Sequence, residues 1–130
     1  MPHFVDTNIV VYAFGPGPKA MRASEVLTSA TISVQVLNEL SNVALRKLGY
    51  DAATLQRRIE TIRGKVNAIA IIDEPTHDLA REIVFRYKLG FYDTVLLASA
   101  LLADCDTFYS EDMHAGLVLE DQLTIRNPFA

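Results

Sequence analysis

The sequence predicts a three-layer α/β/α domain built on a central parallel sheet. Short apolar runs alternate with longer segments in which apolar residues recur at helical spacing. Strands separated by helices imply right-handed crossovers, and these give a parallel sheet with helices on both faces. The chain has 130 residues, half of them hydrophobic, with no linker or internal repeat. We therefore expect one domain that spans residues 1–130.

The N-terminal half contributes two strands and four helices to this prediction. The first strand ends in Phe4-Val5-Asp6, and a short helix over residues 8–13 follows, capped by Thr7 or Asn8. Gly and Pro alternate over residues 15–18 and force a loop. The remaining elements are a helix over residues 19–29, a strand over 31–34, a helix over 36–48, and a helix that begins at Asp51 and carries an apolar stripe to Val66.

The C-terminal half supplies the remaining strands and the most apolar helix. Residues 68–72 are continuously apolar, which predicts a fully buried parallel strand. Pro75 begins a helix that reaches Lys88, and Gly90 separates it from a helix over residues 92–104. That last helix is apolar almost all round and is therefore central. Strands over residues 107–110 and 123–126 complete the sheet.

Charge and cysteine content limit the classes of protein. The net charge of −4 argues weakly against nucleic-acid binding, but eleven of the twelve Lys and Arg residues lie between Lys19 and Lys88. This polarity could place a basic flank beside an acidic centre, although solvated helix faces explain any single Lys or Arg. The single cysteine, Cys105, excludes a disulfide and a multi-cysteine zinc cluster. Without a signal-peptide pattern or a membrane-length apolar run, we expect a soluble, cytoplasmic protein with no membrane association.

Four acidic residues are candidates for a shared site: Asp6, Glu39, Asp93 and Asp112. Each alone has an ordinary explanation as a helix cap, a turn residue or a solvated side chain. Three of them, however, stand at strand ends or a helix start that a parallel sheet gathers at one edge. Like charges brought together there repel unless a cation lies between them. Oxygen ligands without His or Cys indicate a hard ion, Mg²⁺ or Mn²⁺.

With these residues in view, the chain resembles a PIN-domain ribonuclease, specifically the VapC-type toxin of a type II toxin–antitoxin system. The resemblance is carried by Phe4-Val5-Asp6-Thr7-Asn8, Ser33-Val34-Gln35-Val36-Leu37-Asn38-Glu39, Tyr92-Asp93-Thr94 and Ser110-Glu111-Asp112. It implies RNA cleavage that depends on Mg²⁺ or Mn²⁺, a homodimer, and a cognate antitoxin that blocks the site. It also implies that the four acids are catalytic metal ligands, with Asn8 and Ser110 as their polar partners.

One position departs from the family pattern. Many relatives carry a further acid two residues after the match to Asp112, and here that residue is His114. Either Asp112 or Glu111 would have to serve a second ion, or one ion alone binds firmly. The mechanism we expect is hydrolysis of a phosphodiester by metal-activated water. In it Asp6, Glu39 and Asp93 hold the ion, Asp112 completes the site or orients the water, and basic residues on the flanking helices contact phosphates.

Functions of other classes fit the sequence less well. A phosphatase of the haloacid-dehalogenase type needs Asp-x-Asp after its first strand, and residue 8 is Asn. A response-regulator receiver domain needs paired acids after the first strand and a Lys late in the chain, and neither is present. A PIN-like module that binds nucleic acid or a partner without turnover remains the alternative.

Overall fold

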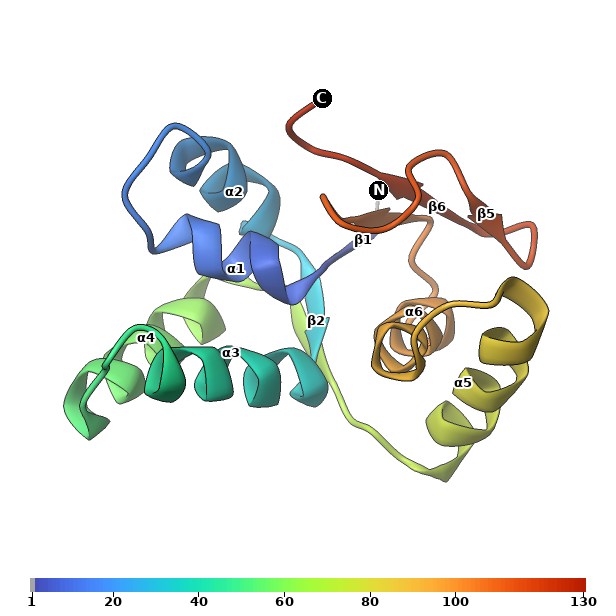
Figure 1. Cartoon of the computed structure of the whole chain (residues 1–130), viewed down its shortest axis with the longest axis horizontal. Helices are drawn as coiled ribbons and strands as arrows, with labels where there is room; N and C mark the ends of the chain where they lie inside the picture. The colour runs from blue at the N-terminus through green and yellow to red at the C-terminus, as the bar shows by residue number, and fades with distance from the viewer. Residues whose placement is uncertain (1) are drawn as a thin grey trace.

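The computed structural model describes residues 2–130, and these form one mixed sheet with helices packed on it (Figure 1). In chain order the elements are β1 (His3–Val5), α1 (Thr7–Ala13), α2 (Ala20–Leu27), β2 (Thr31–Ser33), α3 (Val34–Arg46), α4 (Ala52–Lys65), β3 (Ala68–Ala70), α5 (Glu74–Tyr87), α6 (Phe91–Leu102), β4 (Thr107–Tyr109), β5 (Val118–Leu119) and β6 (Leu123–Arg126). No helix within residues 2–130 combines the length and the apolar character needed to cross a bilayer.

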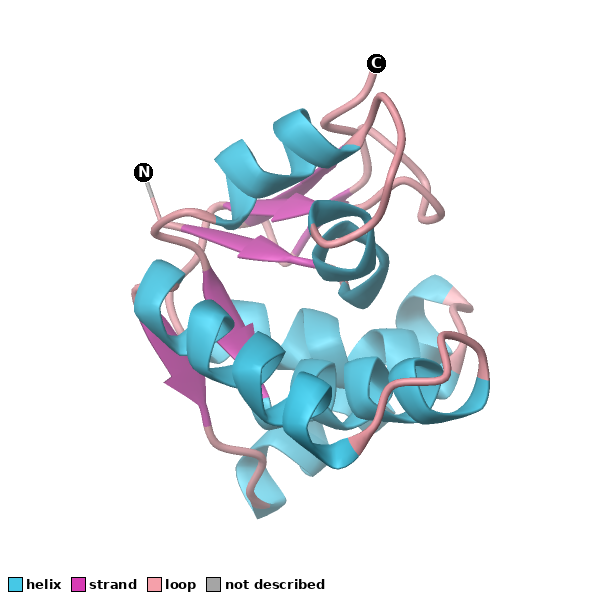
Figure 2. Ribbon diagram, turned by 90° about the vertical axis from the view of Figure 1, so that its left-hand side faces the viewer, coloured by secondary structure: helices cyan, strands magenta, loops and turns pink. Residues whose placement is uncertain are grey.

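The sheet has the strand order β3-β2-β1-β4-β6-β5. All neighbouring strands pair in parallel except β5 and β6, which are antiparallel. Right-handed crossovers from β1 to β2 to β3 put α1–α4 on one face, and the return from β3 to β4 puts α5 and α6 on the other. Figure 1 shows these two groups of helices on opposite sides of the strands. In Figure 2, turned by 90°, the strands are the magenta arrows that lie beside one another. The predicted three-layer α/β/α architecture is confirmed.

The order in which the chain adds strands to the sheet reverses between β1 and β4. The chain leaves β1 toward β2 on one side, whereas β4 pairs with β1 on the other side. In α/β sheets the crevice above the carboxyl ends of two such strands is the usual place for a ligand. Val5 lies opposite Tyr109 in the parallel register. The next residues, Asp6 and Ser110, therefore leave the sheet at the same level.

The core lies on both faces of these two central strands. Phe4 and Phe108 are fully buried neighbours with stacked rings whose centroids are 5.3 Å apart. Every residue of α6 from Thr94 to Leu101 is buried, which confirms that this helix is central. Because β1, β4 and α6 are buried in one core, close packing holds the segments from which the candidate site is built.

Two parts of the sheet differ from the sequence prediction. The apolar run 68–72 is not a fully buried strand, because β3 pairs only with β2 at the sheet edge and the chain leaves the sheet after Ala70. Ile71, just beyond the strand, is 70 % exposed. The strand β5 was not predicted. It has only two residues and depends on antiparallel pairing with β6, so no local pattern identifies it.

Candidate active site

All four acids proposed from the sequence line one cavity of about 400 Å³, here called the acidic cavity. Asp6 comes from the end of β1, Glu39 from α3, Asp93 from the first turn of α6, and Asp112 from the turn after β4. The other residues that line the cavity are Thr7, Asn8, Asn42, Val43 and Met113. A larger cavity of about 640 Å³ beside the loop before α2 contains none of these acids. Because it contains the four acids, the smaller cavity is the candidate active site.

Asp6 is both a helix cap and a wall of the cavity. It is 8 % exposed, and its Oδ1 accepts a hydrogen bond from the backbone N–H of Thr7 at 2.7 Å. Its Oδ2 accepts a hydrogen bond from the hydroxyl of Ser110 at 2.8 Å. The prediction that Thr7 or Asn8 caps α1 is wrong, because β1 runs straight into the helix and leaves Asp6 as the last residue with extended backbone.

Burial raises the pKa of Asp6 from 3.8 to about 6. The hydrogen bonds from Ser110 and Thr7 act in the opposite direction and stabilise the ionised form. The charges of Asp93 and Glu39 raise the pKa further. Above pH 6 the folded protein therefore holds a buried negative charge beside other carboxylates, and a cation or a proton would relieve that cost.

Glu39 is held by two donors that the sequence analysis did not assign to the site. Its Oε1 accepts from the hydroxyl of Thr7 at 2.7 Å, and its Oε2 accepts from the amide of Gln35 at 3.0 Å. Gln35 and Glu39 are four residues apart and lie on the same face of α3, so their spacing was a signal that could have been used. Thr7 links the end of β1 to α3, a contact between distant segments that no local pattern reveals.

Asp93 is the least restrained of the four acids. The N-cap of α6 is Gly90, and no hydrogen bond to the Asp93 carboxylate is found within residues 2–130. Partial burial raises its pKa, and the charges of Glu39 and Asp112 raise it further. The N-terminal end of the α6 dipole favours a negative charge at this position. Asp93 therefore presents a free carboxylate to the cavity rather than capping its helix.

Asp112 lies in an exposed turn that polar contacts hold at the cavity. The side-chain amide of Asn8 donates a hydrogen bond to Asp112 Oδ2. The backbone N–H groups of Asp112 and Met113 both donate to the hydroxyl oxygen of Ser110, at 3.2 and 3.1 Å. Asn8 and Ser110, the two polar partners expected from the resemblance, thus each contact one or more of the acidic segments.

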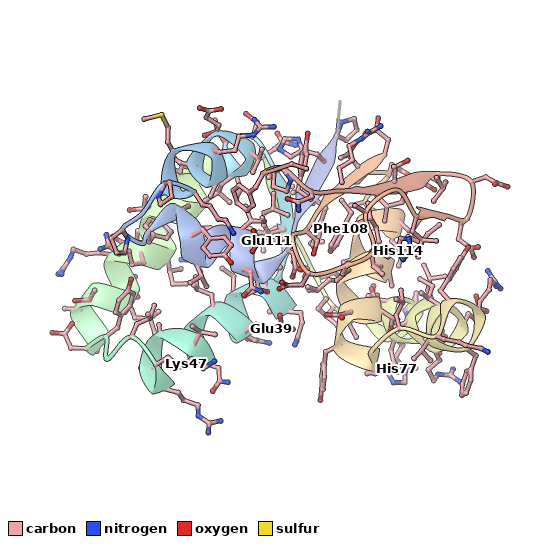
Figure 3. The ribbon with its side chains drawn as sticks, turned by 45° about the horizontal axis from the view of Figure 1, so that its top comes forward. Glu39, Lys47, His77, Phe108, Glu111 and His114 are labelled. Atoms are coloured by element: carbon pink, nitrogen blue, oxygen red, sulfur yellow. The ribbon has the colours of Figure 1, made fainter. Side chains whose placement is uncertain are left out.

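Glu111 and His114 do not line the acidic cavity. The Glu111 carboxylate accepts from the hydroxyl of Tyr12 at 2.7 Å and from the ammonium of Lys19. Lys19, and then Tyr12, lower the pKa of Glu111. Figure 3 labels Glu39 on α3, and Glu111 and His114 in the turn that follows β4. Glu111 is paired with Lys19, and Asp112 is the acid that this turn contributes to the cavity.

The donor set suits a hard divalent cation. Carboxylates, together with the side-chain oxygens of Asn8 and Asn42, are oxygen ligands of the kind that Mg²⁺ and Mn²⁺ prefer. The raised pKa values of Asp6 and Asp93 reflect the burial and mutual repulsion that such a charge would offset. In residues 2–130 no three His, Cys, Asp or Glu side chains already stand at metal-ligand geometry. Ion binding would therefore require side-chain adjustment, for which the unrestrained Asp93 is the most available.

Comparison with known proteins identifies the fold family. A family model described as "PIN domain" matches residues 3–115. No curated protein sequence matches the chain significantly.

Three solved structures illustrate the similarity in fold. The toxin–antitoxin complex from Klebsiella pneumoniae has 18 % identity and a TM-score of 0.72, with 98 % of each chain covered. VapBC2 from Rickettsia felis, bound to a DNA fragment from its promoter, has 19 % identity and a TM-score of 0.64, with 86 % of this chain and 89 % of that chain covered. The sarcin–ricin loop cleaving toxin VapC20 from Mycobacterium tuberculosis has 17 % identity and a TM-score of 0.63, with 85 % and 91 % covered.

Proposed function

The chain belongs to the PIN domain family, and from this premise we propose that it is an endoribonuclease dependent on Mg²⁺ or Mn²⁺. The observation that carries the proposal is the acidic cavity, which is lined by four acidic residues from four separate segments. A purely structural domain has no need to bring these charges together, because their burial and repulsion cost free energy. A nuclease that holds a divalent cation does need them.

In this proposal Asp6, Glu39 and Asp93 hold the ion, and Asp112 completes the site or orients the attacking water. A divalent ion held there would supply Lewis-acid chemistry, the activation of water and the neutralisation of charge on the phosphate. The protein prepares two of the ligands in advance, since Asp6 is oriented by Ser110 and Glu39 by Thr7 and Gln35. Orientation before binding reduces the entropy lost when the ion and substrate arrive.

Basic side chains on the flanking helices would contact the RNA backbone. Arg46 and Lys47 are exposed at the end of α3 and form no ion pair within residues 2–130. Figure 3 labels Lys47 and, on the same helix, Glu39. Contacts to phosphates position a strand without reading its sequence. They would offset the repulsion between RNA and the acidic cavity.

We further propose that this ribonuclease is the toxin of a toxin–antitoxin pair, acts in the cytoplasm and forms a homodimer. The support is the similarity in fold to chains described as parts of toxin–antitoxin and VapBC complexes. A small reading frame that encodes a DNA-binding protein beside the gene for this chain is the expected genetic context. Co-expression and co-purification of the two proteins would test the pairing directly.

The activity is tested with Asp6→Asn and a matched surface control, Asp78→Asn. Asp78 is exposed on α5, where it pairs with Arg81. We expect the wild type and Asp78→Asn to cleave RNA in Mn²⁺ and to stop when EDTA is added. Asp6→Asn should be slower by about 100-fold or more, because it loses a charged ligand. Equal cleavage by all three proteins would refute the proposed site. RNA binding without cleavage by the wild type would favour the alternative, a PIN-like binding module without turnover.

A further inference from the structure

Helix α1 holds two consecutive residues of the turn that follows β4. Asn8 and Tyr12 are four residues apart, so their side chains lie on the same face of the helix. Asn8 donates to the carboxylate of Asp112, and Tyr12 donates to the carboxylate of Glu111. The two neighbouring acids of the turn are thus held by two residues of one helix, one turn of the helix apart.

Lys19 holds Glu111 from a second direction. Its ammonium group pairs with Glu111 Oε2 and lies over the ring of Tyr12, 5.1 Å from the centroid. The same ammonium is 5.2 Å from the ring centroid of Phe129, which packs edge-to-face against Tyr12. We call Tyr12, Lys19 and Glu111 the Glu111 cluster. It joins α1, the loop before α2 and the turn after β4.

The turn has no helix or strand between Tyr109 and Val118, and its backbone hydrogen bonds to β6 are made only at its two ends, by Ser110 and by Gly116 and Leu117. Its middle therefore depends on side-chain contacts of this kind. Ser110 fixes its first backbone amides, and the Glu111 cluster fixes the side chain of the next residue. Glu111 is directed toward Tyr12 and Lys19, whereas Asp112 lines the acidic cavity. Whatever fixes Glu111 therefore constrains the direction in which the following carboxylate can point.

We propose that Tyr12 and Lys19 are positioning residues, which act through Glu111 to hold the turn so that Asp112 faces the acidic cavity. Neither side chain lines that cavity, so neither is placed to bind an ion held there. The role of Asp112 in this inference rests on that proposed function. The ordering of the turn by the Glu111 cluster does not, and it can be measured separately.

The chain contains a matched control for a merely structural role. Tyr87 donates to Glu120 Oε2 at 3.1 Å, and Arg86 pairs with the same carboxylate. This second cluster has the same three parts, a tyrosine, a glutamate and a cation, and joins α5 to the turn between β5 and β6. Tyr87→Phe removes the same kind of hydroxyl–carboxylate contact as Tyr12→Phe, away from the acidic cavity. It also removes the hydrogen bond that the Tyr87 hydroxyl accepts from the backbone N–H of Glu120, so the control loses at least as many contacts.

The test compares Tyr12→Phe with Tyr87→Phe in the full-length protein. Amide hydrogen exchange of Asp112 and Met113 should become roughly tenfold faster in Tyr12→Phe, because one hydrogen bond to a charged group is lost. The affinity for Mn²⁺ and the kcat for RNA cleavage should fall by about the same factor, while KM for RNA stays unchanged. Tyr87→Phe should leave all four quantities at wild-type values.

A charge exchange at Lys19 and Glu111 supplies a rescue experiment. Glu111→Lys alone places two cations together, and Lys19→Glu alone places two anions together, so each should speed amide exchange in the turn. The double variant restores an attractive pair and should recover most of the wild-type protection. A merely additive loss in the double variant would contradict the proposed coupling.

The outcomes separate this inference from the proposed function. A wild-type protein that cleaves no RNA refutes the function, and amide exchange then decides by itself whether the cluster orders the turn. If the wild type cleaves RNA but Tyr12→Phe matches Tyr87→Phe in exchange, Mn²⁺ affinity and kcat, the positioning role is overturned. Faster exchange with unchanged Mn²⁺ affinity and kcat also overturns it.

Discussion

The hydroxyl of Ser110 donates a 2.8 Å hydrogen bond to Asp6 Oδ2, across 104 positions of sequence. The two residues meet because β1 and β4 pair in parallel, with Val5 opposite Tyr109. The same hydroxyl oxygen accepts from the backbone amides of Asp112 and Met113. One buried side chain thus links the acid at the end of β1 to the turn that carries another acid of the cavity.

Ser110→Ala should destabilise the protein by about 1–3 kcal/mol, because it leaves a buried carboxylate oxygen and two amides with fewer partners. Ser99→Ala is the control, since Ser99 is equally buried and its hydroxyl donates only to the carbonyl of Val95 within α6. Urea unfolding of both variants in EDTA measures the difference. If Ser110→Ala lowers the free energy of unfolding no more than Ser99→Ala does, the hydrogen bonds of Ser110 contribute little to stability.

The stability of the metal-free protein should depend on pH through Asp6. Its pKa is about 6 in the folded state and 3.8 in an unfolded chain, so between these values the folded state binds more protons than the unfolded state. Its contribution therefore favours folding near pH 4 and is lost as the pH rises through 6. Asp6→Asn should gain stability relative to the wild type between pH 4 and pH 8, by up to about 3 kcal/mol. Unfolding in EDTA across this range gives the result, and a constant difference between the two proteins would contradict the raised pKa.

Asp93→Asn should raise the melting temperature of the metal-free protein by roughly 2 °C. It removes one repelling charge, for which a solvent-screened interaction of about 0.5 kcal/mol is the appropriate scale. In Mn²⁺ the same variant should gain less stability than the wild type, because it binds the ion more weakly.

The control for Asp93 is Asp73→Asn, which changes a true cap. Asp73 caps α5: its Oδ1 accepts from the hydroxyl of Thr76 at 2.7 Å and from the backbone N–H of Thr76 at 3.1 Å, and these two hydrogen bonds lower its pKa. Asn caps a helix about as well as Asp, so the melting temperature of Asp73→Asn should equal that of the wild type or lie slightly below it. Its response to Mn²⁺ should be unchanged. If Asp93→Asn behaves in the same way as Asp73→Asn, Asp93 is no part of an ion site.

In the proposed toxin–antitoxin pair, the antitoxin should place a basic side chain in the acidic cavity. An Arg guanidinium matches carboxylates bidentately and would replace the cation as the balancing charge. Asp93→Asn should therefore weaken the complex, and high Mg²⁺ should compete with antitoxin binding. Calorimetry with the protein encoded by the adjacent reading frame measures both effects. Indifference to both changes would place the contact elsewhere.

Local patterns in the sequence determined where the elements lie and which of them is central. The apolar run before Asp6, the Gly90 break and the nearly uniform apolar character of residues 94–101 depend only on neighbouring residues, and the structure agrees with them. Asp6 and Asp112 were assigned to strand ends for the same reason. Because parallel strands end at one sheet edge, this was enough to predict that the acids lie near one another.

Long-range pairing decided what the local patterns left open. The run 68–72 lies at an edge because strand order is set by which strands pair across the sheet, and the apolar character of the run does not encode this. Asp6 rather than Thr7 caps α1 because the backbone at the end of β1 is already extended where the helix starts. Asp112 faces the cavity while Glu111 does not because Asn8 and Tyr12 hold the two side chains from one helix, 104 and 99 residues away in sequence. Contacts at such separation exist only after the chain has folded.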